Sequence, residues 1–573
     1  MGTTNEGIQE TDSDDCGKPG SRVSRTRDHD RGLSRFGRAR NTLNRVPESA
    51  IIAIVYLSAH GLMALNRGLF WDDWWGYRLS RSTFARFQKH AGGSIWPAEI
   101  YEWINSGQVS VWITRALCTA LILVSLLAFA EILKSVRPMN RQDRLLTVLV
   151  AATFPVFAAR VPIINATYIW SLCLFMVAWW LADRWADSKQ LWLATIAVVL
   201  FFLSFWTASL LVFYSLVLLF LLYRRSSSEG VKVPDLIGFA KDTWLFLVPA
   251  LLYVVVKVLV PAPSGQYEGY NAVNPDSFFK ALLTTPTVGL LESFFKPIQL
   301  AATSAGLYTV FVLAVLVLLI APYELRRTSH LRTDVALLGI GYLAFCVAVF
   351  PYAAVGKMPT LNGFDSRHQL LVPFGAGVMV VYLVRIAFGR VKYGGWMGLA
   401  VILVVIAGSV SADLRMELEY FREMYKTDSI VRHVGRIPQF KTGTAFMFDD
   451  RTTDLDVSGR GTWRFYEYTG IFYRVFGDET RFGGDPAGWG SFTAAENAAR
   501  QGRGASFRSP EYKLSQYDIR DPQYLVVVER GEPDLRQSTV LARLIWLELA
   551  DRAAFEREVS GVVTLKVSDY AAP

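Results

Sequence analysis

Residues 50–65, AIIAIVYLSAHGLMAL, and residues 68–78, GLFWDDWWGYR, form the stretch that decides the fold. The first run has no Asp, Glu, Lys or Arg. We interpret it as a first membrane-spanning helix, since a bilayer core about 30 Å thick needs roughly 17–25 mostly apolar residues. It comes too late in the chain, and lacks the small-residue cleavage site, to be a signal peptide. The second run places Asp72 and Asp73 directly after this span.

The composition agrees with a membrane protein. Of 573 residues, 52% are hydrophobic and 19% are charged, whereas soluble proteins have about 25% charged residues. This excludes a disordered protein, a disulfide scaffold and an ordinary cytosolic enzyme. Cys16 lies in a polar tail and the other three cysteines lie in apolar runs, so no disulfide framework is predicted. The formal charge of +9 comes from arginines in the tail and in short loops, which is typical of a multi-spanning protein and not of a nucleic-acid-binding one.

Apolar runs recur along the chain and predict a polytopic α-helical membrane protein with eleven spans. The predicted spans are residues 49–66, 109–133, 145–160, 163–182, 190–206, 208–223, 243–260, 305–322, 334–352, 370–388 and 396–412. Basic residues concentrate in the loops 134–144, 184–189, 224–241, 326–332 and 390–392. The positive-inside rule therefore predicts a plasma-membrane protein with a cytoplasmic N-terminus. The odd number of spans then places everything after residue 412 outside.

The predicted organisation has three parts. Residues 1–48 form a disordered basic cytoplasmic tail, residues 49–412 the membrane domain, and residues 413–573 an extracytoplasmic soluble α/β domain. In the last part, strands are expected at 445–448, 524–528 and 562–567, and helices at 463–476 and 539–555.

Two outer segments within the membrane domain, 67–108 and 261–304, are too long to be simple connections. In the first of them, residues 82–87 and 97–104 have the pattern of helices that lie on the membrane surface.

The acidic pair Asp72 and Asp73 is the candidate catalytic element. Two adjacent carboxylates at a membrane surface are costly unless they are solvated, paired or used. One interpretation makes one of them a general base that takes a proton from an attacking hydroxyl. The other makes them an ordinary polar end of a helix. Asp73 is preferred as the base because it lies one residue farther from the membrane end of the loop.

At this point the sequence resembles the GT-C superfamily of membrane glycosyltransferases. Members carry an acidic pair just after the first span, in a long outer loop with interfacial helices, and many end in a periplasmic domain. The resemblance covers the architecture of nearly the whole chain, but its residue-level motif is only Asp72 and Asp73. It implies transfer of a sugar from a polyprenyl-phosphate carrier to a hydroxyl of a glycan or glycolipid acceptor on the outer face. A divalent cation on the acidic pair is left open, and no other cofactor is expected.

A phosphate leaving group needs positive charge more than it needs a proton. Candidate cations for the donor phosphate lie in the loop 356–368, where Arg367, His368 and Lys357 cluster, and arginine binds phosphate through two parallel hydrogen bonds. Arg160, between the third and fourth spans, and Arg115, inside the second, are supporting candidates. The plainer interpretation of all five is contact with lipid headgroups or snorkelling.

Contacts to sugar or acceptor are assigned more loosely. Trp71 and Trp74 could stack on sugar rings, although tryptophan is also the usual interfacial anchor. Tyr267 and Glu268 lie in the second long outer loop without any motif. The Asp-x-Asp motif at 454–456 resembles the metal motif of nucleotide-sugar transferases, but it lies on the side away from cytosolic nucleotides.

Two alternatives remain open. A transporter or flippase of lipid-linked saccharides would place charges near the bilayer midplane and use broken helices. A polysaccharide polymerase or ligase would use outer-loop arginines without needing Asp72 and Asp73.

Overall fold

The computed structural model describes residues 46–78, 108–229, 236–259, 268–269, 272–273, 275–320, 331–361, 363–477, 481–485, 506–508, 516–518 and 523–570, with Ser82, Ala85, Glu99, Glu102 and Trp103. Contacts divide the chain into Met1–Pro47 and Glu48–Pro573, and only the second unit is considered below. The predicted tail up to residue 45, nearly all of the predicted surface helices at 82–87 and 97–104, and Tyr267 lie outside the described residues.

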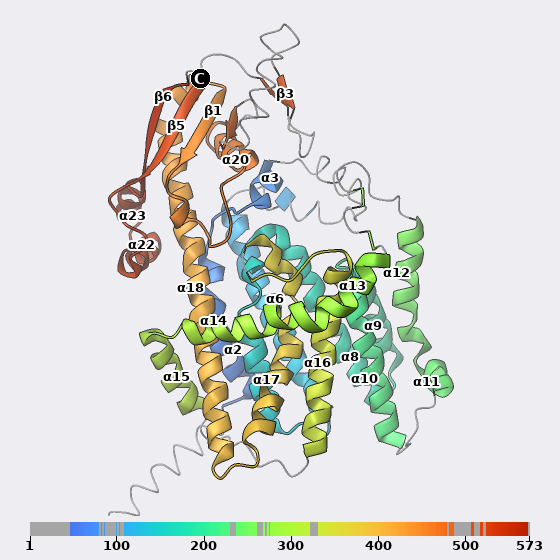
Figure 1. Cartoon of the computed structure of the whole chain (residues 1–573). Coiled ribbons are helices and arrows are strands. Elements are labelled where there is room, and N and C mark those ends of the chain that lie inside the picture. Colours follow the sequence, from blue (N-terminus) through green and yellow to red (C-terminus); the bar gives the residue numbers. More distant parts are fainter. Residues whose placement is uncertain are drawn as a thin grey trace, which may run out of the picture. The chain divides into compact units, whose positions relative to one another are not determined.

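The larger unit is mainly helical up to residue 436 (Figure 1). Its longer helices are α2 (Glu48–His60), α6 (Gln108–Lys134), α7 (Arg141–Thr153), α8 (Ala166–Ser188), α9 (Leu191–Ser204), α10 (Ser209–Glu229), α12 (Val248–Leu259), α15 (Leu307–Ile320), α16 (Leu331–Ala354), α17 (Val372–Phe388) and α18 (Gly394–Arg436). Shorter elements are η1 (Gly61–Leu65), α3 (Asp72–Arg78), η2 (Ala158–Arg160), η3 (Ile163–Asn165), α11 (Leu236–Thr243), η4 (Trp244–Phe246), α13 (Pro275–Thr284), η6 (Thr285–Gly289), η7 (Leu291–Phe295), α14 (Lys296–Thr303) and η8 (Phe364–Gln369).

Each of the eleven predicted spans overlaps a helix, but eleven complete spans are not confirmed. Among the described residues, six helices are long and apolar enough to cross a membrane, or up to eight if two bent pairs each count as one. Helices α9 and α17 are apolar but shorter, and α7 has only 13 residues. Several helices of this molecule could therefore span a membrane, which supports its assignment as a membrane protein.

The third predicted span ends earlier than expected. Helix α7 ends at Thr153, and residues 154–165 contain the two short 3₁₀ turns η2 and η3. Phe154 is extended because it precedes Pro155, and proline disfavours the helical conformation of the residue before it. This irregular segment lies close to the acidic pair, because η3 contacts α3.

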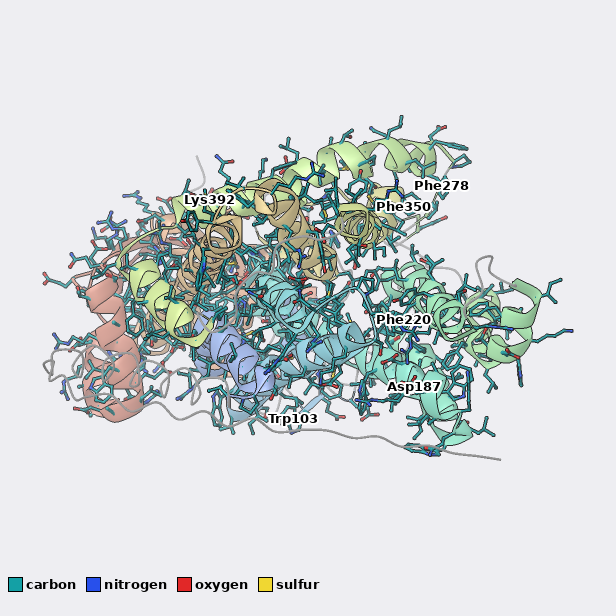
Figure 2. All side chains as sticks on the ribbon, turned by 90° about the horizontal axis from the view of Figure 1, so that it is seen from below. Trp103, Asp187, Phe220, Phe278, Phe350 and Lys392 are labelled. Atoms are coloured by element: carbon teal, nitrogen blue, oxygen red, sulfur yellow. The ribbon has the colours of Figure 1, made fainter. Side chains whose placement is uncertain are left out.

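The segment 261–304, which the sequence predicts to lie outside, contains a long helix that the sequence interpretation missed. Residues 275–303 run from α13 through two π-helical turns to α14, and this helix meets α15 at 104°. It lies across the bundle against α16 and α18 (Figure 1). Phe278 packs edge-on against Phe350 of α16 at 5.3 Å between ring centres, at the rim of the molecule in Figure 2.

Helix α18 links the membrane part to the C-terminal part without a break. It continues to Arg436, so the predicted boundary at residue 412 lies inside a helix. The sequence after 412 is rich in Leu, Met, Arg and Glu, which all favour helix. At Gly408 an added Cβ would lie 2.4 Å from the Ala301 carbonyl oxygen, so glycine allows α14 to approach α18 closely.

The C-terminal part contains a four-stranded sheet, and the three predicted strands are confirmed. Its elements are α19 (Gln439–Thr442), β1 (Ala445–Asp450), η9 (Thr453–Leu455), α20 (Phe465–Phe476), β2 (Phe482–Gly484), β5 (Gln523–Arg530), α22 (Ser538–Ala550), α23 (Arg552–Val559) and β6 (Val563–Asp569). The strand order is β2-β1-β5-β6, with β1 parallel to both neighbours and β6 antiparallel to β5. Strands β3 (Ser506–Arg508) and β4 (Gln516–Asp518) form a separate antiparallel pair.

Packing between α20 and β1 forms the core of this domain. Phe448 stacks on Tyr468 at 4.1 Å between ring centres, and Phe446 packs against Phe472 at 5.0 Å. All four side chains are buried. Since α20 also contacts α3, this core fixes the C-terminal domain directly against the segment that carries the acidic pair.

Candidate functional site

The acidic pair begins helix α3, and the residue before it has an unusual backbone. Trp71 has φ +48°, a conformation that costs a bulky residue free energy and that persists only when its surroundings hold it in place. Its ring lies 5.9 Å from those of Phe364 and Tyr420, and the Arg460 guanidinium lies 5.0 Å above it. The carboxylates are therefore presented by a turn that three other segments of the chain constrain.

Asp73 is the anchored member of the pair. Its side chain is buried, Oδ1 accepts a hydrogen bond from the Ile164 amide at 2.8 Å, and Oδ2 accepts one from the Phe70 amide at 3.1 Å. The Arg115 Nη2 atom lies 3.8 Å from Oδ2. Burial raises the pKa of Asp73 to about 6, although Arg115 and the backbone amides oppose the shift. Asp73 thus ties α3 to the turn η3.

Arg115 is buried in α6 and its donors are used by the protein itself. Nε donates to the Val161 carbonyl at 2.8 Å, Nη1 to the Asn66 carbonyl at 2.7 Å and Nη2 to the Gly68 carbonyl at 2.5 Å. A phosphate could bind here only by displacing a backbone carbonyl. These contacts fix the loop before α3, so Arg115 acts on the acidic pair through the backbone.

Asp72 is the more available member of the pair. It is partly exposed, and Oδ1 accepts a hydrogen bond from the Tyr466 hydroxyl at 3.0 Å. Burial raises the pKa of Asp72 above its usual value, while Tyr466, Arg367 and Arg464 oppose the shift. Phe364 of η8 packs against Trp71, the residue before Asp72, and Arg367 stacks on Phe364, so η8 brings a cation to the side of the acidic pair.

The turn η8 carries this cation. Arg367 stacks on the Phe364 ring at 3.8 Å, and its Nη2 lies 3.3 Å from an Asp365 carboxylate oxygen. Ser366 fixes the turn, because its hydroxyl donates to the Gly363 carbonyl and accepts from the Ala159 amide at 2.8 Å. The turn η8 is thus bound to η2, which contacts η3, and η3 in turn contacts α3.

Lys357 and His368 complete the predicted cluster with Arg367. Burial lowers the pKa of Lys357 to about 8, helped by Arg367 and opposed by Asp365. Burial, Arg367 and Lys357 lower the pKa of His368 to about 3, so this imidazole is neutral at physiological pH and supplies no positive charge. Its ring packs on Tyr352 at 4.7 Å, and its buried Nδ1 has no hydrogen-bond partner among the described residues.

Arg160 is not part of this cluster. Its Nε donates to the Phe157 carbonyl at 2.7 Å, and neither Nη forms a hydrogen bond or ion pair with a described residue. Beside it lies a cavity of about 30 Å³, otherwise lined by apolar groups such as Phe154, Leu370 and Phe374. This space suits one water molecule, and in this conformation it is too small for a phosphate.

A second group of ionisable residues faces Arg160. His60 Nε2 lies 3.3 Å from Asp413 Oδ2, and His60 Nδ1 lies 3.4 Å from Glu417 Oε1. All three side chains are buried between α2 and α18, and Glu417 Oε2 accepts a hydrogen bond from the Met63 amide at 2.9 Å. We call His60, Asp413 and Glu417 the span cluster. The sequence signal for it was a histidine inside an apolar run and two acids four residues apart just after residue 412.

The C-terminal domain supplies residues that the sequence interpretation did not single out. Besides Tyr466, Arg460 forms buried ion pairs with Glu423 of α18 and Glu467 of α20. Burial lowers the pKa of Arg460 to about 10 and raises that of Glu467 well above its usual value. Because Arg460 also covers Trp71, this domain forms one wall of the acidic-pair site. No local motif marks these residues.

The remaining candidates are dispersed. Trp74 is buried against Gly470 of α20 and is not free to stack on a sugar, whereas Glu268 lies in an exposed turn. Asp456, of the rejected Asp-x-Asp motif, is bound to Lys426 Nζ at 2.7 Å. Within the described ranges, no group of three or more His, Cys, Asp or Glu side chains could hold a metal ion.

Comparisons with known proteins assign no family. No family model matches the chain, and no curated protein matches it significantly.

Proposed function

We propose that this protein is a GT-C-like membrane glycosyltransferase that moves a sugar from a polyprenyl-phosphate donor to a hydroxyl of a glycan or lipid-linked acceptor. The observation that carries the proposal is that Trp71, next to Asp72, packs against Phe364, on which the Arg367 guanidinium stacks. Lys357 is close enough to Arg367 for their charges to interact. A base beside a pair of cations is what attack by a hydroxyl and departure of a phosphate require. The position of the acidic pair after the first apolar helix also supports the proposal, because it is the feature in which the sequence resembles the superfamily.

The two carboxylates have different roles in this proposal. Asp72 is the general base, since it is the less enclosed of the two and, among the described residues, only its Oδ1 has a side-chain hydrogen bond. Asp73 is a positioning residue, since both of its oxygens accept backbone hydrogen bonds. This reverses the preference drawn from the sequence, which rested only on distance along the loop.

The chemical step balances with these groups. The acceptor oxygen forms a bond to the anomeric carbon and its proton passes to Asp72. The bond between that carbon and the phosphate oxygen breaks, and its electron pair leaves on the phosphate, which Arg367 and Lys357 stabilise. His368 is neutral and offers a hydrogen bond instead of a charge. Tyr466 orients the base, and the C-terminal domain that carries it contacts the acceptor.

The direct test uses purified protein in nanodiscs with a panel of polyprenyl-phosphate sugars and a mixture of glycan acceptors. The proposal is supported if free polyprenyl phosphate is released only when a glycan acceptor is present. Asp72→Asn is the control for contaminating activity, and Asp449→Asn, at a partly exposed position near the end of β1, is the matched control substitution. The proposal fails if no donor is consumed, or if Asp72→Asn releases the carrier as fast as wild type.

In the same proposal the site faces the outer side of the plasma membrane and the N-terminus is cytoplasmic. The basic loops support this orientation. A cysteine at exposed Ser458 should react with an impermeant thiol reagent in intact cells, whereas native Cys16 should react only after lysis. Labelling of residue 458 only after lysis would reverse the topology.

One observation favours a second candidate, a flippase or transporter of lipid-linked saccharides. The span cluster places two carboxylates and a histidine in buried positions on candidate spanning helices, and such residues often mark transport pathways. Transport predicts movement of an unaltered lipid-linked saccharide across proteoliposome membranes, with loss of this movement in Asp413→Asn. A protein that releases free carrier without moving intact donor is a transferase.

A further inference from the structure

Helix α22 presents an apolar stripe to the outside. Ala542, Trp546 and Leu549 are spaced i, i+4, i+7 and share one exposed face, whereas Leu541 and Leu544 are buried on the other. Trp546 is 67% exposed and Leu549 is 57% exposed. Across the described residues from 413 to 570, these are the two large apolar side chains that are exposed. In the described part of this domain, the exposed large apolar side chains therefore lie on a single helix.

Contacts place α22 at the level where the first candidate span ends. Glu548, between the two apolar residues, accepts a hydrogen bond from the Tyr425 hydroxyl at 2.9 Å. Its other oxygen lies 3.6 Å from Arg67 Nε. Arg67 follows η1, which ends the candidate span Glu48–Leu65. The apolar stripe is thus adjacent to the membrane boundary defined by this span.

The views show α22 beside the helical bundle and not above its centre. In Figure 1 it lies to the left of α18, and in Figure 2, seen from below, the red C-terminal helices form the left edge of the molecule. Helix α15 lies on the same side of α18 in both views. Its Leu307 and Phe311 are 90% and 65% exposed, as expected for a lipid-facing helix. A bilayer that surrounds α15 would extend beneath α22.

We propose that α22 rests on the bilayer, with Trp546 and Leu549 inserted at the boundary between headgroups and acyl chains. Tryptophan favours this boundary because its ring is apolar and its N–H is polar. The exposed Arg543 and Arg552 on the same part of the domain form ion pairs with Glu558 and Glu556, so the apolar stripe and not a positive charge carries the proposed contact. The contact would fix the height of the C-terminal domain, and with it Tyr466, above the membrane. The inference rests on the membrane assignment and not on the proposed transferase activity.

The test measures where these side chains lie. Nitroxide labels are attached one at a time to Trp546→Cys and Leu549→Cys in a full-length variant without native cysteines, reconstituted in nanodiscs of phosphatidylethanolamine and phosphatidylglycerol. Accessibility to oxygen, which enters lipid, is compared with accessibility to a nickel chelate, which stays in water. Phe311→Cys is the lipid control, and Lys566→Cys, on exposed β6, is the water control.

A ratio of oxygen to nickel accessibility several-fold higher at both α22 positions than at position 566 is the expected result. A ratio equal to that at position 566 would place the helix in water and overturn the proposal. Low accessibility to both reagents would show that protein covers the stripe, as in a second copy of this chain, and would also overturn it. Because the position 311 control reports the membrane independently, failure at α22 is distinguishable from failure of the membrane assignment.

Discussion

The acidic pair on α3 and His60 of the span cluster lie at opposite ends of one short stretch of chain, from His60 to Asp73. Both sites contain buried carboxylates, and those of the span cluster come from α18. Around Asp73 each oxygen accepts a backbone hydrogen bond, and an arginine lies within 3.8 Å. In the span cluster His60 Nδ1, Asp413 Oδ2 and Glu417 Oε1 are buried without a hydrogen-bond partner among the described residues. The two sites therefore bury their carboxylates to a similar extent but differ in the hydrogen-bond donors around them.

The difference lies in the donors that surround each group. A buried charge is tolerated when hydrogen bonds and opposite charges replace water, and it is costly when they do not. In the α3 site the backbone amides and Arg115 surround Asp73, whereas Asp72 is partly exposed on the side of Arg367. A partly exposed carboxylate near a cation is suited to proton transfer. The span cluster brings acids together with few donors, which suits neutral carboxyl groups that fill space between α2 and α18.

Replacing Asp72 tests this comparison with the largest expected effect. Loss of a general base costs about 10²–10⁴-fold in rate, so Asp72→Asn should abolish most acceptor-dependent release of the carrier. Because the Asp72 side chain is partly exposed, the melting temperature of the Asp72→Asn variant should stay at the wild-type value. Asp73→Asn should instead lower the melting temperature, since an amide cannot accept from two backbone amides and Arg115 as a carboxylate does. Equal kinetic and stability effects in the two variants would contradict the division of roles.

Arg367 is expected to show the next largest effect. A hydrogen bond to a charged group contributes about 1.5–3 kcal/mol, so Arg367→Ala should lose roughly 10–100-fold in kcat/KM for the donor. Part of the loss should appear in kcat, because charge on the departing phosphate oxygen grows in the transition state. Arg367→Lys should recover some of it, since lysine keeps the charge but not the two parallel donors. Contact with headgroups alone predicts unchanged kinetics in both variants.

A pH profile gives a smaller but well-defined effect. The pKa of Lys357 is lowered to about 8, so its positive charge is present below pH 8 and is lost as the pH rises. The rate should therefore fall on the alkaline side, by at most roughly tenfold per pH unit. Lys357→Arg should move this decline to higher pH, because arginine stays charged. An alkaline decline that is identical in the variant would assign it to another group.

The sequence predicted where helices and strands lie better than it predicted where they end and how they are connected. Apolar runs are sufficient to locate helices, and each predicted span overlaps one. The pattern could not show that α18 continues past residue 412, because the composition changes there from apolar to charged while the backbone stays helical. It also missed the helix 275–303, which packs against α16 and α18 and meets α15 at 104°.

The candidate site was predicted in part for a similar reason. Asp72, Asp73, Arg367, Lys357 and His368 belong to two dense local clusters, so their residue types were visible in sequence. Tyr466 and Arg460 reach the site only because α20 packs against α3, and nothing near them in the chain indicates this. Arg115 was assigned to phosphate because sequence does not show that backbone carbonyls occupy its donors.

The span cluster should give the smallest effect in a transfer assay. In the transferase interpretation its carboxyl groups do not touch the substrate, so Asp413→Asn should leave the rate of carrier release at the wild-type level. Since an amide of the same shape needs no compensating charge, the free energy of unfolding should be unchanged or higher by about 1 kcal/mol. Glu417→Gln is the matched variant, because the amide oxygen can still accept from the Met63 amide. Both are measured by thermal unfolding in nanodiscs together with the donor assay. Suppose that Asp413→Asn no longer consumes the polyprenyl-phosphate sugar although its stability is unchanged. This result would show that the buried carboxyl groups of the span cluster take part in the reaction. It would also move the functional centre from α3 toward the candidate spans.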